Sequence, residues 1–300
     1  MPPPALSSPI AGPPLDRAAF DRLAGLAHSE AGLAIAPSKS AMVRTRLARR
    51  LRKLGIGSFE QYTELVESDA GRNERREMIS ALTTNVSNFF REGHHFTRLQ
   101  EEVFPALRQR LATGGRVRIW SAGCSNGQEP YSLAIAFLEA GPLPERADFR
   151  VLASDIDPKV VAFGHVGRYH DSMMTGLSEA HRQAHFTPCP REANHQIVSS
   201  ALRSMVVFRE LNLQDRWPMR GRFDVIFCRN VVIYFDAATQ NRLWHRFAEV
   251  LHPEGWMFLG HSERVSENCS KLFSNRGDTA YQRCPPPAPP PPRPALMKGE

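Results

Sequence analysis

The stretch RVRIWSAGCSNGQEPYSLAIAFLEA, from Arg116 to Ala140, decides the fold of this 300-residue chain. It begins with a short apolar and β-branched run, passes through a loop that contains Gly123 and Gly127, and continues as an apolar helical pattern. A strand, a glycine-containing loop and a helix in this order are typical of a parallel sheet, with the loop backbone able to approach a ligand. By itself this signal is weak, because the loop matches neither the dinucleotide fingerprint nor the Gly-Lys-Ser/Thr phosphate-binding loop.

Short apolar runs alternate with helical stretches along the rest of this region. The runs are FRVLASD, SMVVFREL, FDVIFC and WMFLGH. Their alternation with helices predicts an α/β domain with a parallel sheet over residues 91–284. Before it, over residues 16–90, apolar residues recur every three or four positions, which predicts a small all-helical domain with Ser58 as one N-cap.

Polar residues follow several of the predicted strands. Asp155 ends FRVLASD, Asn212 follows SMVVFREL, and Arg229 and Asn230 follow FDVIFC. Ligands of parallel sheets bind at the carboxyl ends of the strands, where a carboxylate can accept hydrogen bonds from ribose hydroxyls. On position alone, an N-cap role for Asp155 has equal weight. Together these strand ends predict a ligand site at one edge of the sheet.

Composition narrows the classes of protein. The five cysteines are scattered, with no CxxC pair and no histidine at zinc-ligand spacing, so we expect neither disulfides nor a metal. No run approaches the roughly 18 apolar residues of a membrane helix, and no secretory signal pattern is present. We therefore expect a cytoplasmic protein without membrane insertion. Proline-rich composition predicts disordered tails at residues 1–15 and 285–300.

Five motifs occur in a fixed order along the chain. They are TTNVSNFFRE (Thr83 to Glu92), WSAGCSNGQEPYSLA (Trp120 to Ala134), ASDID (Ala153 to Asp157), FCRNVVIYF (Phe227 to Phe235) and GHSE (Gly260 to Glu263). Together they resemble the CheR family of chemotaxis receptor glutamate O-methyltransferases, over Asp16 to about Cys284. The resemblance implies an all-α N-terminal domain and a Rossmann-like class I methyltransferase domain, α/β in class, with a small antiparallel β-subdomain inserted near residues 186–205.

The resemblance also implies a cofactor and an acceptor. The cofactor is S-adenosyl-L-methionine, which becomes S-adenosyl-L-homocysteine, and the acceptor is a glutamate side chain in the acidic helical methylation region of a chemoreceptor. The positions that match the family's cofactor contacts are Asn85, Ser87, Arg91, Gly123, Glu129, Asp155, Asn212, Leu213, Asn230 and Val231.

Arg91 and Tyr234 are the candidate catalytic residues. The planar guanidinium of Arg91 can form a bidentate pair with the substrate carboxylate, the cofactor's own carboxylate being an alternative partner. The Tyr234 hydroxyl can donate to the same substrate group, although an aromatic residue in so apolar a run is as often part of the core. No general base is required, because free glutamate titrates near pH ~4.3 and its carboxylate is already ionised. We interpret His261 as structural or pocket-lining.

The segment from Lys39 to Lys53 holds seven cations and no acidic residue, with an apolar stripe at helical spacing. Such a run is usually a solvated helix face, and nucleic acid is another partner of basic helices. Aromatic residues for base stacking are absent from the segment, and the resemblance favours an acidic receptor helix. We therefore expect a monomer that binds no nucleic acid and docks its receptor through Arg44, Arg46, Arg49, Arg50 and Lys53.

Two further questions concern the acceptor. Family members that bind a receptor-tail pentapeptide carry a glycine-rich turn in the β-subdomain, whereas PREANHQIVSSALRSM, residues 190–205, has no glycine. We therefore predict recognition independent of such a tail. The alternatives to receptor methylation are a regulatory module that only binds S-adenosylmethionine and a methyltransferase for another acceptor. Against a nucleic-acid amino-methyltransferase, RNVVIYF stands where an Asp/Asn-Pro-Pro-aromatic motif is expected.

Overall fold

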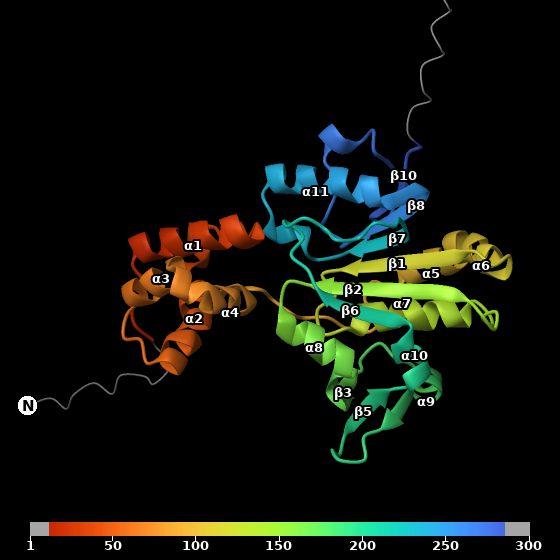
Figure 1. Ribbon diagram of the computed structural model, residues 1–300, viewed down its shortest axis with the longest axis horizontal. Coiled ribbons are helices and arrows are strands. Elements are labelled where there is room, and N and C mark those ends of the chain that lie inside the picture. The colour runs from red at the N-terminus through yellow and green to blue at the C-terminus, as the bar shows by residue number, and fades with distance from the viewer. Residues whose placement is uncertain (1–11, 286–300) are drawn as a thin grey trace, which may run out of the picture.

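The computed structural model describes residues 12–285, in which a group of helices precedes an α/β domain (Figure 1). Asp16 and Ser58 cap the first and third helices by accepting hydrogen bonds from the backbone N–H of Ala19 and Gln61, at 2.7 and 3.2 Å. The N-cap role predicted for Ser58 is therefore confirmed. The N-terminal helices are α1 (Arg17–Ala31), α2 (Ser40–Leu54), α3 (Phe59–Glu67) and α4 (Arg72–Leu82).

Residues 12–15 belong to the helical domain and not to the expected tail. Leu15 packs against the hydrophobic core of this domain, and a Cβ on Gly12 would lie 2.7 Å from the Cβ of Ala48. The predicted tail was too long because the prediction rested on proline content and did not consider that Leu15 could pack against the helical core. The remainder of the two predicted tails, residues 1–11 and 286–300, lies outside the described residues.

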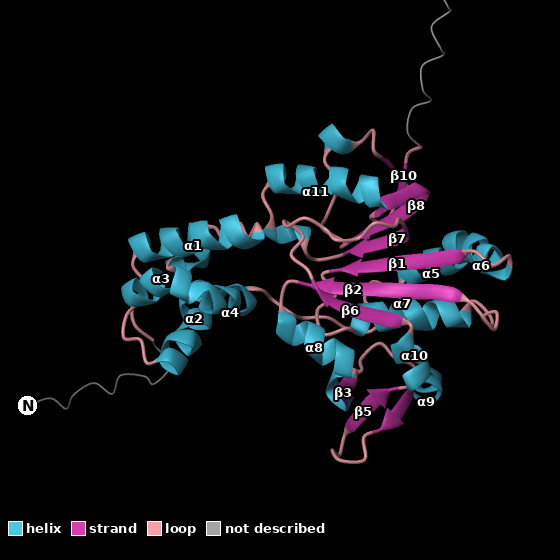
Figure 2. Cartoon of the chain, in the orientation of Figure 1, coloured by secondary structure: helices cyan, strands magenta, loops and turns pink. Residues whose placement is uncertain are grey.

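The main sheet has seven strands in the order β6-β2-β1-β7-β8-β10-β9. The first five are parallel, and each overlaps one of the apolar runs read as strands in the sequence. Their carboxyl ends share one edge, and in Figure 2 their arrowheads point toward the N-terminal helices. The strands are β1 (Arg116–Ala122), β2 (Asp148–Asp155), β6 (Val206–Glu210), β7 (Phe223–Cys228), β8 (Leu251–Leu259), β9 (Phe273–Asn275) and β10 (Ala280–Arg283).

Helices cover both faces of this sheet and create two hydrophobic cores. On one face, Phe137 of α7 stacks on Phe149 of β2 with ring centroids 4.2 Å apart. On the other, Phe247 of α11 packs edge-on against Trp120 of β1, and this core continues into the N-terminal helices. The flanking segments are α5 (His94–Arg98), a π-helical turn (Leu99–Val103), α6 (Phe104–Ala112), α7 (Gln128–Glu139), α8 (Pro158–Val166) and α11 (Ala237–Val250).

A second, three-stranded antiparallel sheet is inserted between α8 and β6, with strand order β3-β5-β4. It begins earlier than the expected range of 186–205, because the first strand lies directly after α8, and residues 200–204 are helical. The sequence missed this first strand because RYH is too short to show a period of two. The inserted subdomain comprises β3 (Arg168–His170), α9 (Glu179–His185), β4 (Phe186–Pro188) and β5 (His195–Val198), and α10 (Ser200–Ser204) leads back to β6.

Candidate functional site

A cavity of about 330 Å³ lies at the carboxyl-terminal edge of the main sheet. Its walls come from the loops after β1, β2, β6, β7 and β8, from the end of α1 and the residues after it, and from the linker between α4 and α5, residues 83–93. The structure gathers around it every residue predicted to bind the cofactor or to act in catalysis: Asn85, Ser87, Arg91, Gly123, Glu129, Asp155, Asn212, Leu213, Asn230, Val231 and Tyr234.

Two glycines shape the loop after β1. Gly123 has a φ of 87°, and a Cβ there would lie 2.2 Å from Cγ2 of Val231 in the loop after β7. Gly127, with a φ of 89°, precedes α7, and its Cβ would lie 3.0 Å from the Cα of Gly164 in α8. Only glycine fits these two positions without strain, because both need a left-handed backbone and a close neighbour.

Asp155 presents its carboxylate at the end of β2. Its two oxygens accept hydrogen bonds from the backbone N–H of Ser125 and Asp157, at 2.9 and 3.0 Å. Burial raises the pKa of this carboxyl, and the two backbone donors oppose that effect. The N-cap of α8 is Asp157, which accepts from the N–H of Lys159, so the capping role considered for Asp155 is filled by its neighbour. The carboxylate oxygens of Asp155 retain lone pairs for a ligand.

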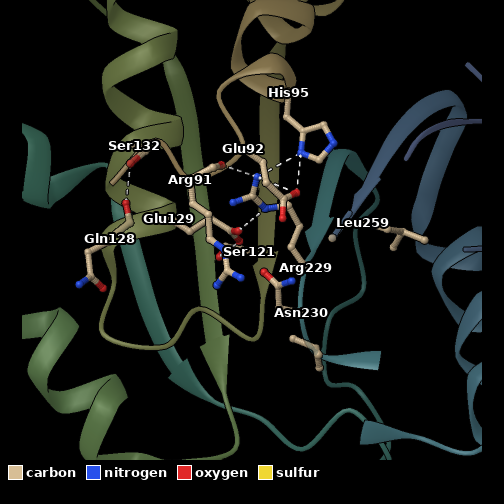
Figure 3. A network of polar contacts seen from close by, with 12 residues as sticks. Arg91, Glu92, His95, Ser121, Gln128, Glu129, Ser132, Arg229, Asn230 and Leu259 are labelled. Atoms are coloured by element: carbon tan, nitrogen blue, oxygen red, sulfur yellow. Dashed lines mark hydrogen bonds and ion pairs between the residues drawn. The ribbon is translucent and has the colours of Figure 1, made fainter. Parts of the chain in front are cut away.

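Glu129 lies in a buried polar network beside the cavity (Figure 3). Its carboxylate accepts from the hydroxyl of Ser121 at 2.7 Å and from Nε of Arg229 at 2.9 Å. Arg229 also donates to the backbone oxygen of Arg91 at 2.7 Å and to Nδ1 of His95 at 3.1 Å. Arg229 is only 6% exposed, and a cation so buried needs these hydrogen-bond partners. Through them it connects Glu129 to the linker.

His95 and Glu92 complete the network on its far side. Burial and the adjacent Arg229 lower the pKa of His95 to about 4, so its ring is neutral near pH 7. Its Nε2–H donates to the backbone oxygen of Asp278 at 2.7 Å. Together with His94, these residues offer ligand atoms close enough to hold an ion. Since the Arg229 guanidinium already supplies the positive charge beside Glu92 and His95, we assign no metal to this group.

Arg91, Tyr234 and His261 surround the cavity on the linker side and on the β7 side. The guanidinium of Arg91 donates one hydrogen bond, to the backbone oxygen of Val86 at 3.2 Å, so other N–H groups remain for a ligand. Tyr234 is partly exposed, and its backbone oxygen accepts from the N–H of Ala34, which fixes the loop to the N-terminal domain. His261 is 70% exposed and lines the cavity, in agreement with a pocket-lining role.

Asn85 and Asn212 line the cavity, but their side-chain amides also form hydrogen bonds to neighbouring segments of the protein. Nδ2 of Asn85 donates to Asp157 at 2.9 Å. Nδ2 of Asn212 donates to the backbone oxygen of Glu30 at 2.7 Å, and its Oδ1 accepts from the N–H of Gln214. The side chain of Asn212 therefore joins the loop after β6 to α1.

Glu263 does not line the cavity but holds the loop after β7 that does, a role that sequence reasoning missed. Its side chain is 3% exposed, and burial raises the pKa of its carboxyl, an effect that the surrounding backbone donors oppose. The motif GHSE pointed to this position without giving it a role, although an acid four residues after the end of a buried strand was a signal. The carboxylate accepts hydrogen bonds of 2.6 to 3.3 Å from the backbone N–H groups of Asn230, Val231, Val232, Ile233 and Gly260. It thereby sets the shape of the loop after β7, in which Asn230 has a φ of 58°.

Helix α2 divides its basic residues between internal contacts and solvent. Arg46 donates to the backbone oxygens of Leu82 and Thr83 and to the hydroxyl of Thr84. Instead of forming part of a free docking surface, it therefore fastens α2 to the start of the linker. The predicted receptor-binding residues that remain exposed are Arg44, Arg49 and Lys53.

Arg50 is likewise internal and not free for docking. It is 12% exposed and pairs with Glu74 and Glu77 of α4, at 2.5 and 2.6 Å. The hydroxyl of Tyr62 also donates to Glu74 at 2.9 Å, so that this buried acid joins three helices. The sequence did not distinguish Arg46 and Arg50 from their neighbours, because which cations meet α4 depends on how the helices pack.

Comparison with known proteins agrees with this architecture. Residues 18–83 match the model of the CheR methyltransferase all-alpha domain, and residues 85–281 match that of the CheR methyltransferase SAM binding domain. The chain belongs to the CheR methyltransferase family. The predicted family, fold class and cofactor are thereby confirmed.

Curated relatives of the CheR family match over nearly their whole length. A probable chemotaxis protein methyltransferase of Rhizobium etli is 46% identical over 256 residues, which cover 85% of this chain and 96% of the relative. The chemotaxis protein methyltransferase of Salmonella typhimurium is 41% identical over 271 residues, covering 89% and 90%. Chemotaxis protein methyltransferase 2 of Pseudomonas aeruginosa is 39% identical over 254 residues, covering 83% and 87%.

The cavity fits S-adenosylmethionine, the cofactor of the CheR methyltransferases. The hydroxyl of Ser125, which lines the cavity, is buried and has no hydrogen-bond partner in the described part of the chain. A buried polar atom of this kind is normally satisfied, so a bound ligand is its natural partner. The carboxylates of Glu129 and Asp155 suit a cofactor that carries positive charge on sulfur and on an amino group. No helix within residues 12–285 is long and apolar enough to cross a membrane.

Proposed function

We propose that this CheR family member transfers the methyl group of S-adenosylmethionine to glutamate side chains of a chemoreceptor, forming glutamyl methyl esters. The observation that carries the proposal is that Arg91 lines the same cavity as the acidic residues Glu129 and Asp155. A cation at that place can hold the anionic acceptor, whereas the two acids suit the cationic cofactor.

The chemistry that the bound cofactor supplies is an electrophilic methyl group on a sulfonium. Arg91 pairs with the acceptor carboxylate and aligns it, and Tyr234 donates a hydrogen bond to the same group. With the cofactor bound, Asp155 would accept from the ribose hydroxyls, and Glu129, fixed by Arg229, would accept from the amino group. Since the acceptor is already ionised at neutral pH, alignment and exclusion of water are the main contributions, and alignment can supply roughly 7–11 kcal/mol.

Receptor docking in this proposal uses the exposed face of α2. Arg44, Arg49 and Lys53 attract the acidic helices of the methylation region, and long-range attraction of this kind speeds association. Arg46 supports the arrangement indirectly, because it connects α2 to the linker that carries Arg91. A receptor helix bound to α2 is therefore held at a fixed position relative to the cavity.

We further propose that docking does not depend on a receptor-tail pentapeptide. The connection between β4 and β5 contains no glycine, and its one left-handed residue is Asn194, with a φ of 58°. The partner is acidic protein and not nucleic acid, and the protein acts as a monomer in the cytoplasm, where the methylation regions of receptors lie.

The deciding experiment combines the purified protein, methyl-labelled S-adenosylmethionine and membranes that each contain one candidate chemoreceptor. The expected result is label on the receptor that mild base releases as methanol, lost when the receptor glutamates are replaced by alanine. Base-stable label would indicate another acceptor. Cofactor binding without transfer to any receptor would indicate a regulatory module. A receptor-tail peptide should fail to bind at micromolar concentration in calorimetry, and micromolar binding would overturn tail independence.

A further inference from the structure

The backbone on both sides of Arg91 adopts a conformation that side chains rarely accept. Phe90 has a φ of 51° and Glu92 a φ of 56°, both in the left-handed region. Residues other than glycine stay there only when their surroundings hold them. The direction of the Arg91 side chain depends on both neighbours, so whatever holds Phe90 and Glu92 also aims Arg91.

Part of this support comes from the methyltransferase domain itself. The buried hydroxyl of Ser132 in α7 accepts a hydrogen bond from the N–H of Phe90 at 2.9 Å and donates to the backbone oxygen of Gln128 (Figure 3). Arg229 donates to the backbone oxygen of Arg91. These contacts fix the main chain, and the ring of Phe90 packs on Phe96 of α5 with ring centroids 5.0 Å apart.

The inserted subdomain supplies the other neighbour of the Phe90 ring. It stacks on the imidazole of His181 in α9, with ring centroids 4.8 Å apart and an interplanar angle of 15°. Nε2 of His181 lies 2.6 Å from a carboxylate oxygen of Glu139 in α7, and its Nδ1 accepts from the N–H of Ser178 at 3.3 Å. Both ring nitrogens are therefore engaged, and the imidazole forms a fixed plane beneath Phe90.

The preceding residue packs on the same subdomain. The ring of Phe89 meets Tyr169 of β3 and Phe186 of β4 edge-on, with centroids 5.2 and 5.7 Å apart. A Cβ on Gly176 would lie 2.0 Å from the backbone oxygen of Phe89, so the two backbones are in direct contact. The inserted subdomain is thus packed against the two residues that precede Arg91.

We propose that His181 is a positioning residue for methyl transfer: by stacking on Phe90 it stabilises the left-handed backbone next to Arg91 and keeps the guanidinium directed at the acceptor. This inference rests on the proposed function, because it concerns the efficiency of that reaction. It gives the inserted subdomain a part in the reaction that is separate from any binding of receptor peptides.

The test compares three variants with the wild-type protein. His181→Ala removes the stack, His181→Phe keeps a planar ring without its nitrogens, and Gln183→Ala changes an exposed residue of the same helix as a matched control. The measurements are kcat and KM for receptor methylation, the affinity for S-adenosylhomocysteine, and hydrogen exchange of residues 86–93 in the free protein.

We expect His181→Ala to lower kcat by about 10- to 100-fold, the loss typical of a displaced aligning group. Cofactor affinity should stay within about threefold, exchange in the linker should speed up, and His181→Phe should restore most of kcat because it restores the stack. Gln183→Ala should behave as wild type. If His181→Ala does not fold, Glu139→Ala, which removes the acceptor of the Nε2–H group and so releases the imidazole from one side, should give a smaller fall in kcat and faster linker exchange.

Three results would overturn the inference: unchanged kcat in His181→Ala, equal losses of kcat in His181→Ala and His181→Phe, or linker exchange that His181→Ala leaves unchanged. Linker exchange also separates this inference from the proposed function. If the wild-type protein methylates no receptor, the proposed function fails, while exchange in the free protein still decides whether His181 holds the linker.

Discussion

Replacing Gly123 with alanine should destabilise the protein and damage the cofactor site together. Two independent effects act at this residue. Its φ of 87° is left-handed, and a Cβ would lie 2.2 Å from Cγ2 of Val231, well inside van der Waals contact. The β-branched Val231 has little rotamer freedom with which to withdraw.

The magnitude follows from adding the two effects. A left-handed backbone costs a residue other than glycine about 1–2 kcal/mol, and forcing a methyl group into a packed site costs about 1–3 kcal/mol. Gly123→Ala should therefore lower the free energy of unfolding by about 2–5 kcal/mol, a large share of the roughly 5–15 kcal/mol of a typical domain. Gly114 is a matched control, because its φ is 80° and open space surrounds the position of its Cβ. Gly114→Ala should show the backbone cost alone.

Urea denaturation of Gly123→Ala, Val231→Ala and the double variant measures the steric part directly. Because Val231→Ala removes the clashing methyl groups, the double variant should be about 1–3 kcal/mol more stable than the sum of the single effects predicts. Titration with S-adenosylhomocysteine should show weaker binding by Gly123→Ala, because both loops line the cavity. A loss of stability in Gly123→Ala no larger than in Gly114→Ala, or effects that simply add, would refute the close approach of the two loops.

Four further predictions concern the site and helix α2. Arg91→Ala should lower kcat for receptor methylation by about 100- to 1000-fold with an unchanged circular dichroism spectrum, and near-normal turnover would remove Arg91 from the mechanism. Charge reversal at Arg49 and Lys53 should raise the receptor KM about tenfold at low salt while leaving cofactor affinity unchanged. Arg50→Ala should instead lower the free energy of unfolding by about 3–5 kcal/mol, because it leaves the buried carboxylate of Glu74 without its cationic partner. The pKa of His95 is about 4 in the folded protein and ~6.5 in an unfolded chain. Between these two pH values the unfolded state binds more protons than the folded state, so the free energy of unfolding falls as the pH drops from ~6.5 to about 4. In urea titrations, the wild type should lose about 2 kcal/mol more between pH 7 and pH 5 than His95→Gln, and equal losses would contradict a neutral His95.

The sequence predicted the edge of the sheet at which the cavity lies, because parallel strands place their carboxyl ends together. Once FRVLASD and FDVIFC are strands of one parallel sheet, Asp155 and Asn230 must lie at the same edge, whatever the details of packing. The sequence also predicted the glycine-containing loop after β1, because the left-handed backbone at Gly123 and Gly127 favours glycine. Position alone did not decide between the two roles considered for Asp155, because an N-cap and a ligand-binding carboxylate can both lie between the end of a strand and the next helix.

Other features depended on contacts between distant segments. Arg46 and Arg50 look identical to Arg49 in the sequence, but the packing of α2 against α4 and the linker turns the first two inward. The first strand of the inserted sheet, at Arg168–His170, has no period of its own and exists because β5 pairs with it. Its pairing depends on the arrangement of the chain on both sides.

By itself, the sequence of this protein determined the helical and α/β domains, the family, the cofactor and the strand ends that form the cavity. These features follow from local periodicity, from backbone conformations that only glycine favours and from co-linear motifs. Only the tertiary structure decided which charged side chains stay exposed. It also showed that the Glu263 carboxylate accepts hydrogen bonds from the backbone of the loop after β7, and that His181 stacks on Phe90. Such pairings join residues far apart in the chain, and side-chain packing in three dimensions selects them.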